Sequence, residues 1–119
     1  MALDSHDVPH VAYQNLSDNV KKISYATLDV TATQISGYNV WVVETVDTNL
    51  GNTAGSWLSI DLDSQDRPHI SYYSGDGVNS IKYAFRNSTG WHNHTVDTGY
   101  NKLGWFSAIK IDSTDNPHI

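Results

Sequence analysis

A nine-residue motif occurs three times in this chain and constrains its fold more than any other feature. The copies occupy residues 3–11, 62–70 and 111–119, and each reads aliphatic, Asp, Ser, any residue, Asp, any residue, Pro, His, aliphatic. Asp and Ser side chains bond to nearby backbone amides in turns, and Pro sets φ where the chain becomes extended again. The motif therefore predicts the end of one strand, a tight turn and the start of the next strand.

Other landmarks recur between the copies, so a whole unit repeats. Residues 23–26 resemble 81–84, residues 41–48 resemble 91–98, and residues 55–60 resemble 104–109. In the second unit they predict four extended segments, at residues 57–63, 68–73, 80–85 and 91–97, separated by turn sequences. The first unit differs mainly at residues 28–39, where a polar insertion replaces a short turn. We expect features specific to this protein there.

The composition and the repeat length both favour an all-β fold. Glu occurs once, whereas Tyr, Trp, Thr, Val and Ile are abundant. Four strands in a repeat of roughly 40–50 residues are typical of a β-propeller blade. We predict two four-stranded antiparallel blades, residues 1–54 and 55–103, followed by the first hairpin of a further blade at residues 104–119.

Two blades do not close a ring, because closed propellers contain about four to eight. Uncovered flanks of such sheets invite association with other chains. We therefore expect a cyclic homo-oligomer in which the extra hairpin acts as a closing strap. A trimer with six blades is favoured, and a tetramer with eight is the alternative. A longer parent chain that carries the remaining blades is the other way to close the ring.

Charge and residue types exclude several classes of protein. The net charge is −6, and the 7 basic residues are scattered, so a nucleic-acid or anionic-lipid binder is disfavoured. The chain has no Cys, so it has neither disulfides nor a thiolate metal site. No apolar run reaches membrane-spanning length. The first four residues lack the basic and apolar regions of a signal peptide, so none is expected in this chain.

Essentially the whole chain resembles a tandem β-propeller repeat that is common in large surface and secreted proteins of archaea and bacteria. The resemblance rests on residues 59–64 (SIDLDS), 68–73 (PHISYY) and 81–84 (IKYA), followed by residues 91–97. The hairpin is also similar to that of NHL-type blades. The resemblance implies an adhesive or structural role at the cell surface or outside the cell. The chain departs from the repeat at Ser56, where the second copy has Trp105, and at Asp66 and Asp115, where the repeat more often carries Gly.

Residues that recur in every unit are expected to serve the fold. One His recurs in all three motifs, and we predict that it fixes the turn through a hydrogen bond. A ring of His that binds a metal or senses pH is the alternative. The predicted structural repeat positions are His10, His69, His118, Pro9, Pro68, Pro117, Trp41 and Trp91.

Two features are candidate metal ligands, but neither leads us to expect a cofactor. His92 and His94 point the same way on one predicted strand, and such a pair can chelate Zn²⁺ or Ni²⁺ when a third ligand is near. Because that strand is outermost in a blade, an exposed pair without a metal is favoured. The turn at residues 112–116 offers carboxylates for Ca²⁺, but its spacing does not match an EF-hand loop.

Aromatic residues beside turns are the candidate ligand-binding residues. Trp57 and Trp105 lie next to predicted turns, and Tyr38 and Tyr100 are in similar positions. Aromatic rings can stack on sugars, and repeated blades would present repeated shallow sites that bind with avidity. A lectin-type propeller that binds glycans is therefore the alternative function.

Enzymatic functions have less support. A glycosidase needs two positioned carboxylates, whereas nearly all the Asp residues lie in repeated turns. Sialidase-like propellers use an arginine cluster for the substrate carboxylate, and this chain has only Arg67 and Arg86. No nucleophile elbow, phosphate loop or zinc-protease helix is present. We predict a non-enzymatic binding or structural module, with a lectin second and a glycosidase third.

Overall fold

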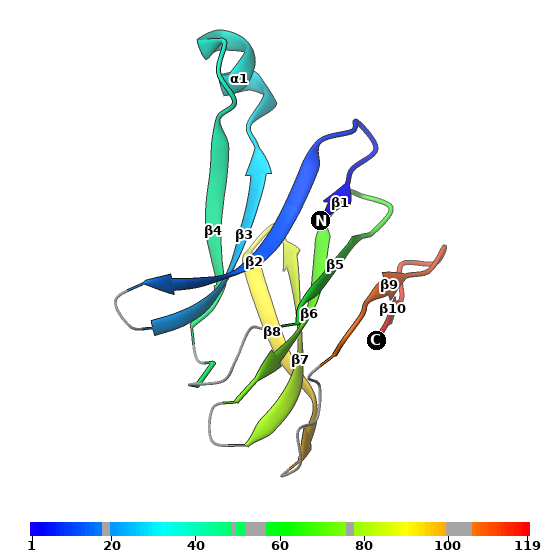
Figure 1. The fold of residues 1–119 in the computed structure, drawn as a ribbon. Coiled ribbons are helices and arrows are strands. Elements are labelled where there is room, and N and C mark those ends of the chain that lie inside the picture. Colours follow the sequence, from blue (N-terminus) through cyan, green and yellow to red (C-terminus); the bar gives the residue numbers. More distant parts are fainter. Residues whose placement is uncertain (18–19, 49, 52–56, 76–77, 100–105) are drawn as a thin grey trace.

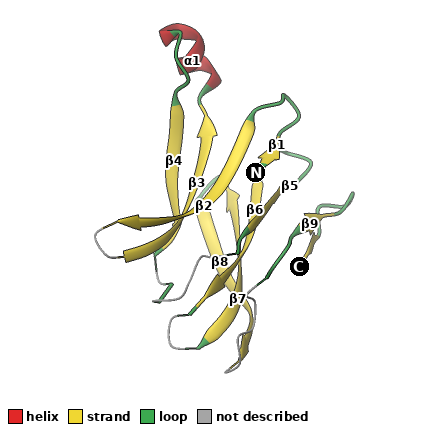
Figure 2. Ribbon diagram, viewed as in Figure 1, coloured by secondary structure: helices red, strands yellow, loops and turns green. Residues whose placement is uncertain are grey.

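The computed structural model contains two four-stranded antiparallel sheets, which lie next to one another, and a short C-terminal hairpin (Figures 1 and 2). It describes residues 1–17, 20–48, 50–51, 57–75, 78–99 and 106–119. This arrangement confirms the predicted all-β class and the predicted four-stranded sheets.

Each sheet follows the order of the chain. The first sheet consists of β1 (Ala2–Leu3), β2 (Pro9–Ser17), β3 (Val20–Leu28) and β4 (Trp41–Asp47). The second consists of β5 (Ser59–Leu62), β6 (Pro68–Ser74), β7 (Asn79–Asn87) and β8 (Gly90–Gly99). The hairpin pairs β9 (Lys110–Ile111) with β10 (Pro117–His118). All four extended segments expected in the second unit contain a strand.

The two sheets share even their irregularities. The register shifts between Ile23 and Ser24 in the first sheet, and between Ile81 and Lys82 in the second. Residues 23 and 81 are repeat equivalents, so the same bulge bends both sheets at the same place. The repeat seen in the sequence is therefore a repeat of backbone geometry.

The insertion at residues 28–39 folds differently from expectation, because it contains a helix, α1 (Val30–Ser36). Local capping explains it. The Asp29 side chain accepts a hydrogen bond from the Ala32 amide, and Gly37, at φ 72°, donates its amide to the Thr33 carbonyl. No residue of α1 is buried, and Ile35 is 83 % exposed. The helix was not predicted because the chain as a whole is poor in helix-forming residues, and the two capping residues were not considered.

The core lies between the two sheets and draws side chains from both. It is formed by Ala12, Ile23, Tyr25, Val46, Leu50, Ile60, Ile70, Tyr72 and Ala84. Tyr72 is fully buried and donates its hydroxyl to the Asp47 carboxylate across the sheet boundary, at 2.8 Å. The second sheet therefore depends on the first for its main hydrophobic contact.

The opposite side of the first sheet is uncovered. We call it the outer face, and it consists of Leu3, Val11, Tyr13, Trp41 and Val43, which alternate along the strands with residues that face the core. Trp41 is 45 % exposed and Val43 56 % exposed. The equivalents of Val11 and Tyr13 in the second sheet, Ile70 and Tyr72, are fully buried against the first sheet.

Among the residues that the structure describes, no helix has both the length and the apolar character needed to cross a membrane.

Candidate functional site

The first Asp of the motif holds each turn together. Asp63 accepts hydrogen bonds from the Gln65 and Arg67 amides, both at 2.9 Å. Asp4 and Asp112 accept the equivalent pairs of amides in the other two turns. This is the backbone turn bonding that the motif predicts.

The second Asp of the motif links one turn to the turn before it. The Ser5 amide and hydroxyl donate to the two carboxylate oxygens of Asp66, at 2.9 and 2.6 Å. Ser64 donates in the same way to Asp115, at 2.8 and 2.7 Å. We call each of these pairs a turn clamp. Both aspartates have left-handed backbone, with φ of 59° and 64°, a conformation that favours Gly.

The turn clamp is expected to add measurable stability. Asp7 has the same backbone, at φ 61°, but its side chain has no bonded partner within the described part of the chain. Asp66→Ala and Asp7→Ala therefore carry the same backbone strain, and Asp66→Ala also loses two hydrogen bonds. We expect Asp66→Ala to lower the free energy of unfolding by about 1 kcal/mol more than Asp7→Ala in urea titrations. Equal losses would show that the clamp adds no stability.

The repeated histidines lie in hydrogen-bonded chains. His10 Nε2 is 3.4 Å from Asp4 Oδ2, and His10 Nδ1 is 2.6 Å from the Tyr25 hydroxyl. In the second sheet, His69 is 3.3 Å from Asp63 and 2.6 Å from the Tyr83 hydroxyl. Both ring nitrogens of these two histidines are thus occupied, which fits a role in fixing the turn. His118 is bonded to Asp112 at 2.9 Å.

The environment of these chains sets the protonation of the tyrosine and of the aspartate. Burial raises the pKa of Tyr25 to about 12, so its phenol stays neutral at physiological pH. Burial also raises the pKa of Asp63, but hydrogen bonds from the Arg67 backbone and side chain outweigh that effect, and its pKa is lowered overall. Asp63 is therefore a carboxylate that accepts hydrogen bonds and holds no proton for general acid catalysis.

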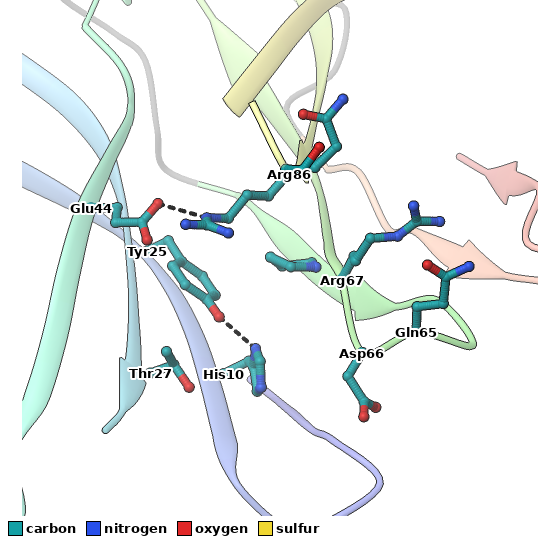
Figure 3. A pocket seen from close by; sticks show the side chains of 11 residues that line it. His10, Tyr25, Thr27, Glu44, Gln65, Asp66, Arg67 and Arg86 are labelled. Carbon is teal, nitrogen blue, oxygen red and sulfur yellow. Dashed lines mark hydrogen bonds and ion pairs between the residues drawn. The ribbon is translucent and has the colours of Figure 1, made fainter. Parts of the chain in front are cut away.

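A cavity of about 400 Å³ opens between the first sheet and the second (Figure 3). We call it the inter-sheet pocket. Strands β2, β3 and β4 form one wall, and the turn before β6 and the end of β7 form the other. Its lining residues are His10, Tyr25, Thr27, Glu44, Gln65, Asp66, Arg67, Pro68, Arg86, Asn87 and Ser88.

One charged pair is fixed at this pocket. Glu44 accepts hydrogen bonds from Arg86 Nε at 2.8 Å and from Trp91 Nε1 at 2.9 Å (Figure 3 shows the Arg86 bond). The Glu44 hydrogen bond raises the pKa of Arg86, which stays charged. Arg67 is bonded through Nε to Asp63, and its guanidinium turns away from Arg86 (Figure 3).

The aromatic residues predicted to bind a ligand do not line this pocket. Trp57 packs against Phe106, with ring centroids 4.8 Å apart, and Tyr38 is 80 % exposed after α1. Trp105 and Tyr100 lie outside the described residues. The two predicted tryptophans of the repeat differ, because Trp91 packs edge-on against Tyr25 whereas Trp41 is on the uncovered outer face.

The predicted metal candidates are not brought to a common site. His92 is bonded to Asn87 and Thr89, and the rings of His92 and His94 stack on Phe85 at 5.2 and 5.9 Å. Among the described residues, only Asp4, His6 and Asp66 have potential ligand atoms within 4.8 Å of one another. Both oxygens of Asp66 already serve the turn clamp, so this group has little left for a cation.

The pocket was not predicted from the sequence, although the positions of the charged residues point to it. The only Glu of the chain and its only two Arg all line the pocket. These residue types are rare here, and each stands at a position that its repeat equivalent does not share. These three charged residues differ from their repeat equivalents, so positions that do not recur indicate this site.

Comparison with known proteins adds no relative. The chain matches no family model, and neither the curated proteins nor the solved structures contain a match.

Proposed function

We propose that this protein is a non-enzymatic binding or structural module of the β-propeller type. Its two sheets act as blades, and its copies assemble head to tail into a closed ring, with three chains as the favoured number. The observation that carries this proposal is the uncovered outer face of the first sheet.

The contacts between the two sheets show how the outer face of a sheet is buried when a neighbouring sheet packs against it. The equivalent face of the second sheet buries Ile70 and Tyr72, and its Trp91 packs on Tyr25 and donates to Glu44. The first sheet presents the same residue types, with Trp41 in place of Trp91. Exposed Trp41, Val43 and Leu3, with half-buried Tyr13 on the same side of the sheet, form a surface that favours a partner.

The second sheet offers a matching surface at the other end of the molecule. Its far face consists of Tyr83, Phe85, His92, His94 and Val96, on the side away from the first sheet. Val96 is 53 % exposed, whereas its equivalent, Val46, is 4 % exposed in the core. Tyr83 and His94 stand where Tyr25 and Glu44 receive Trp91. The far face of one copy therefore fits the outer face of another.

The C-terminal hairpin has a defined place in such a ring. It lies beside β5, where Asp61 accepts from the Ile111 amide at 2.9 Å and Asp115 holds Ser64. Residues 109–119 of one copy and 1–11 of the next carry the same motif, so only one of them can occupy this place. We propose that the hairpin does so, as a strap, with Ser113 beside Asp66 of the next copy.

Light scattering tests the assembly. We expect a mass three times that of the 13.2 kDa chain, and four times is the alternative ring. Trp41→Asp and Val96→Asp should each give single chains, and their equimolar mixture should give a dimer, because one intact contact remains. Ile35→Asp changes a more exposed apolar residue on α1, away from both faces, and should leave the ring intact. A wild-type protein that stays a single chain at high concentration overturns the proposal.

A second candidate function is carbohydrate binding, and the inter-sheet pocket is the observation that favours it. A cavity of about 400 Å³ lies within the size range of small-ligand sites. Its wall combines neutral and charged hydrogen-bonding groups, which can bind the hydroxyl groups of a sugar. A glycan array with a neutral and an acidic set of sugars tests it, and a protein that binds none is a scaffold only.

A further inference from the structure

We propose that the inter-sheet pocket binds a sugar that carries a carboxylate, such as a uronic acid, with Arg86 as the residue that recognises the carboxylate. This inference rests on the second candidate function, carbohydrate binding, and not on the ring. In a single copy both walls of the pocket come from one chain, and a strap that replaces residues 1–11 would exchange only His10 of the lining.

Arg86 is positioned as an anion receptor. Its Nε is held by Glu44, so the side chain is fixed from behind, while its two terminal nitrogens have no bonded partner within the described residues. The side chain is 42 % exposed, which leaves it accessible to a ligand. A guanidinium with two free terminal nitrogens binds a carboxylate through two parallel hydrogen bonds.

The carboxylates of the pocket are engaged by other groups of the chain. Both oxygens of Asp66 accept from Ser5, and Glu44 Oε2 accepts from Arg86 Nε and from Trp91 Nε1. These bonds hold the two acidic side chains in place and leave the terminal nitrogens of Arg86 as donors for a negatively charged ligand.

The rest of the lining favours a sugar ring over a bare anion. Thr27, Gln65, Asn87 and Ser88 are neutral lining side chains that can bond to hydroxyl groups. The Thr27 hydroxyl already donates to the Pro9 carbonyl and Asn87 Oδ1 already accepts from Thr89, so Thr27 is left as an acceptor and Asn87 as a donor. Pro68 and Tyr25 also line the pocket, but both are buried, so they add only a small apolar surface for the CH groups of a pyranose. A phosphate or acetate ion would use the guanidinium and leave these groups without a partner.

Titration calorimetry or ligand-observed NMR with four small probes tests this inference. Glucuronate is expected to bind about tenfold or more tightly than glucose, which lacks the carboxylate, and than acetate or inorganic phosphate, which lack the ring. Equal binding of glucose and glucuronate overturns the role of the carboxylate. Equal binding of acetate and glucuronate overturns the role of the sugar, and no binding of glucuronate overturns the site.

Variants of Arg86 test the residue. Arg86→Gln should weaken glucuronate binding about tenfold or more without changing the weak binding of glucose. Arg86→Lys should weaken glucuronate binding less, because lysine keeps the positive charge but cannot form the two parallel hydrogen bonds of a guanidinium. Lys110→Gln removes one positive charge away from the pocket and should change nothing. Unchanged glucuronate binding by Arg86→Gln overturns the assignment. Light scattering of the same samples reports the ring separately, so failure of one proposal is not mistaken for failure of the other.

Discussion

Replacing Asp63 with alanine is expected to lower the free energy of unfolding by about 3 kcal/mol. The Asp63 side chain is fully buried at the turn between β5 and β6. It accepts from two backbone amides and from Arg67 Nε, and it lies 3.3 Å from His69 Nε2. Removing it leaves buried donors without an acceptor and frees His69 and Tyr83 from their chain of hydrogen bonds.

The chain supplies its own control for this measurement. Asp112 makes the same turn contacts in the C-terminal hairpin, but there the turn is exposed to water. Asp112→Ala should therefore cost much less, since water replaces the lost acceptor. Urea unfolding followed by tryptophan fluorescence measures both variants at low concentration, where single chains prevail. Similar losses for the two positions would contradict the view that burial makes the Asp63 network important.

Replacing Trp91 with alanine is expected to lower the free energy of unfolding by about 3 kcal/mol as well. Trp91 joins the two sheets, because its ring packs on Tyr25 with centroids 5.3 Å apart and its indole donates to Glu44. Truncation leaves a cavity between the sheets and removes one of the two donors that hold Glu44 in place.

Trp41→Ala is the matched control, because Trp41 is the repeat equivalent of Trp91 but lies on the uncovered outer face. In dilute solution, where single chains prevail, we expect it to cost less than about 1 kcal/mol. Thermal unfolding of both variants at the same low concentration checks this difference. A loss as large as that of Trp91→Ala would show that Trp41 is already covered within one chain.

Strand positions were predictable from the sequence because they depend on local patterns. The motif, its turn residues and the strand-forming composition lie within a few residues of one another, and the strands begin and end close to where these signals fall. The helix α1 was not predicted, since its stability comes from Asp29 and Gly37 at its ends and from no apolar periodicity. The prediction relied on the composition of the whole chain and so missed a helix that depends on two local capping residues.

Contacts between units were harder to predict because they depend on how one sheet is placed on the next. The turn clamps join residues about fifty to sixty positions apart, and no pattern within one motif indicates such a pair. The pocket joins Glu44 to Arg86, which belong to different sheets. No spacing rule within one unit connects such residues, so only the structure shows that the two arginines and the single glutamate meet.

The turn clamp has a direction, because in both copies a serine of the earlier turn binds an aspartate of the later one. A dimer that places outer face against outer face would leave both far faces uncovered and Ser113 without an aspartate of a later turn. Head-to-tail contact instead lets Ser113 of each subunit bind Asp66 of the next through one kind of heterologous contact. The polarity of this small link therefore favours a closed head-to-tail ring over a back-to-back dimer in any assembly built from these sheets.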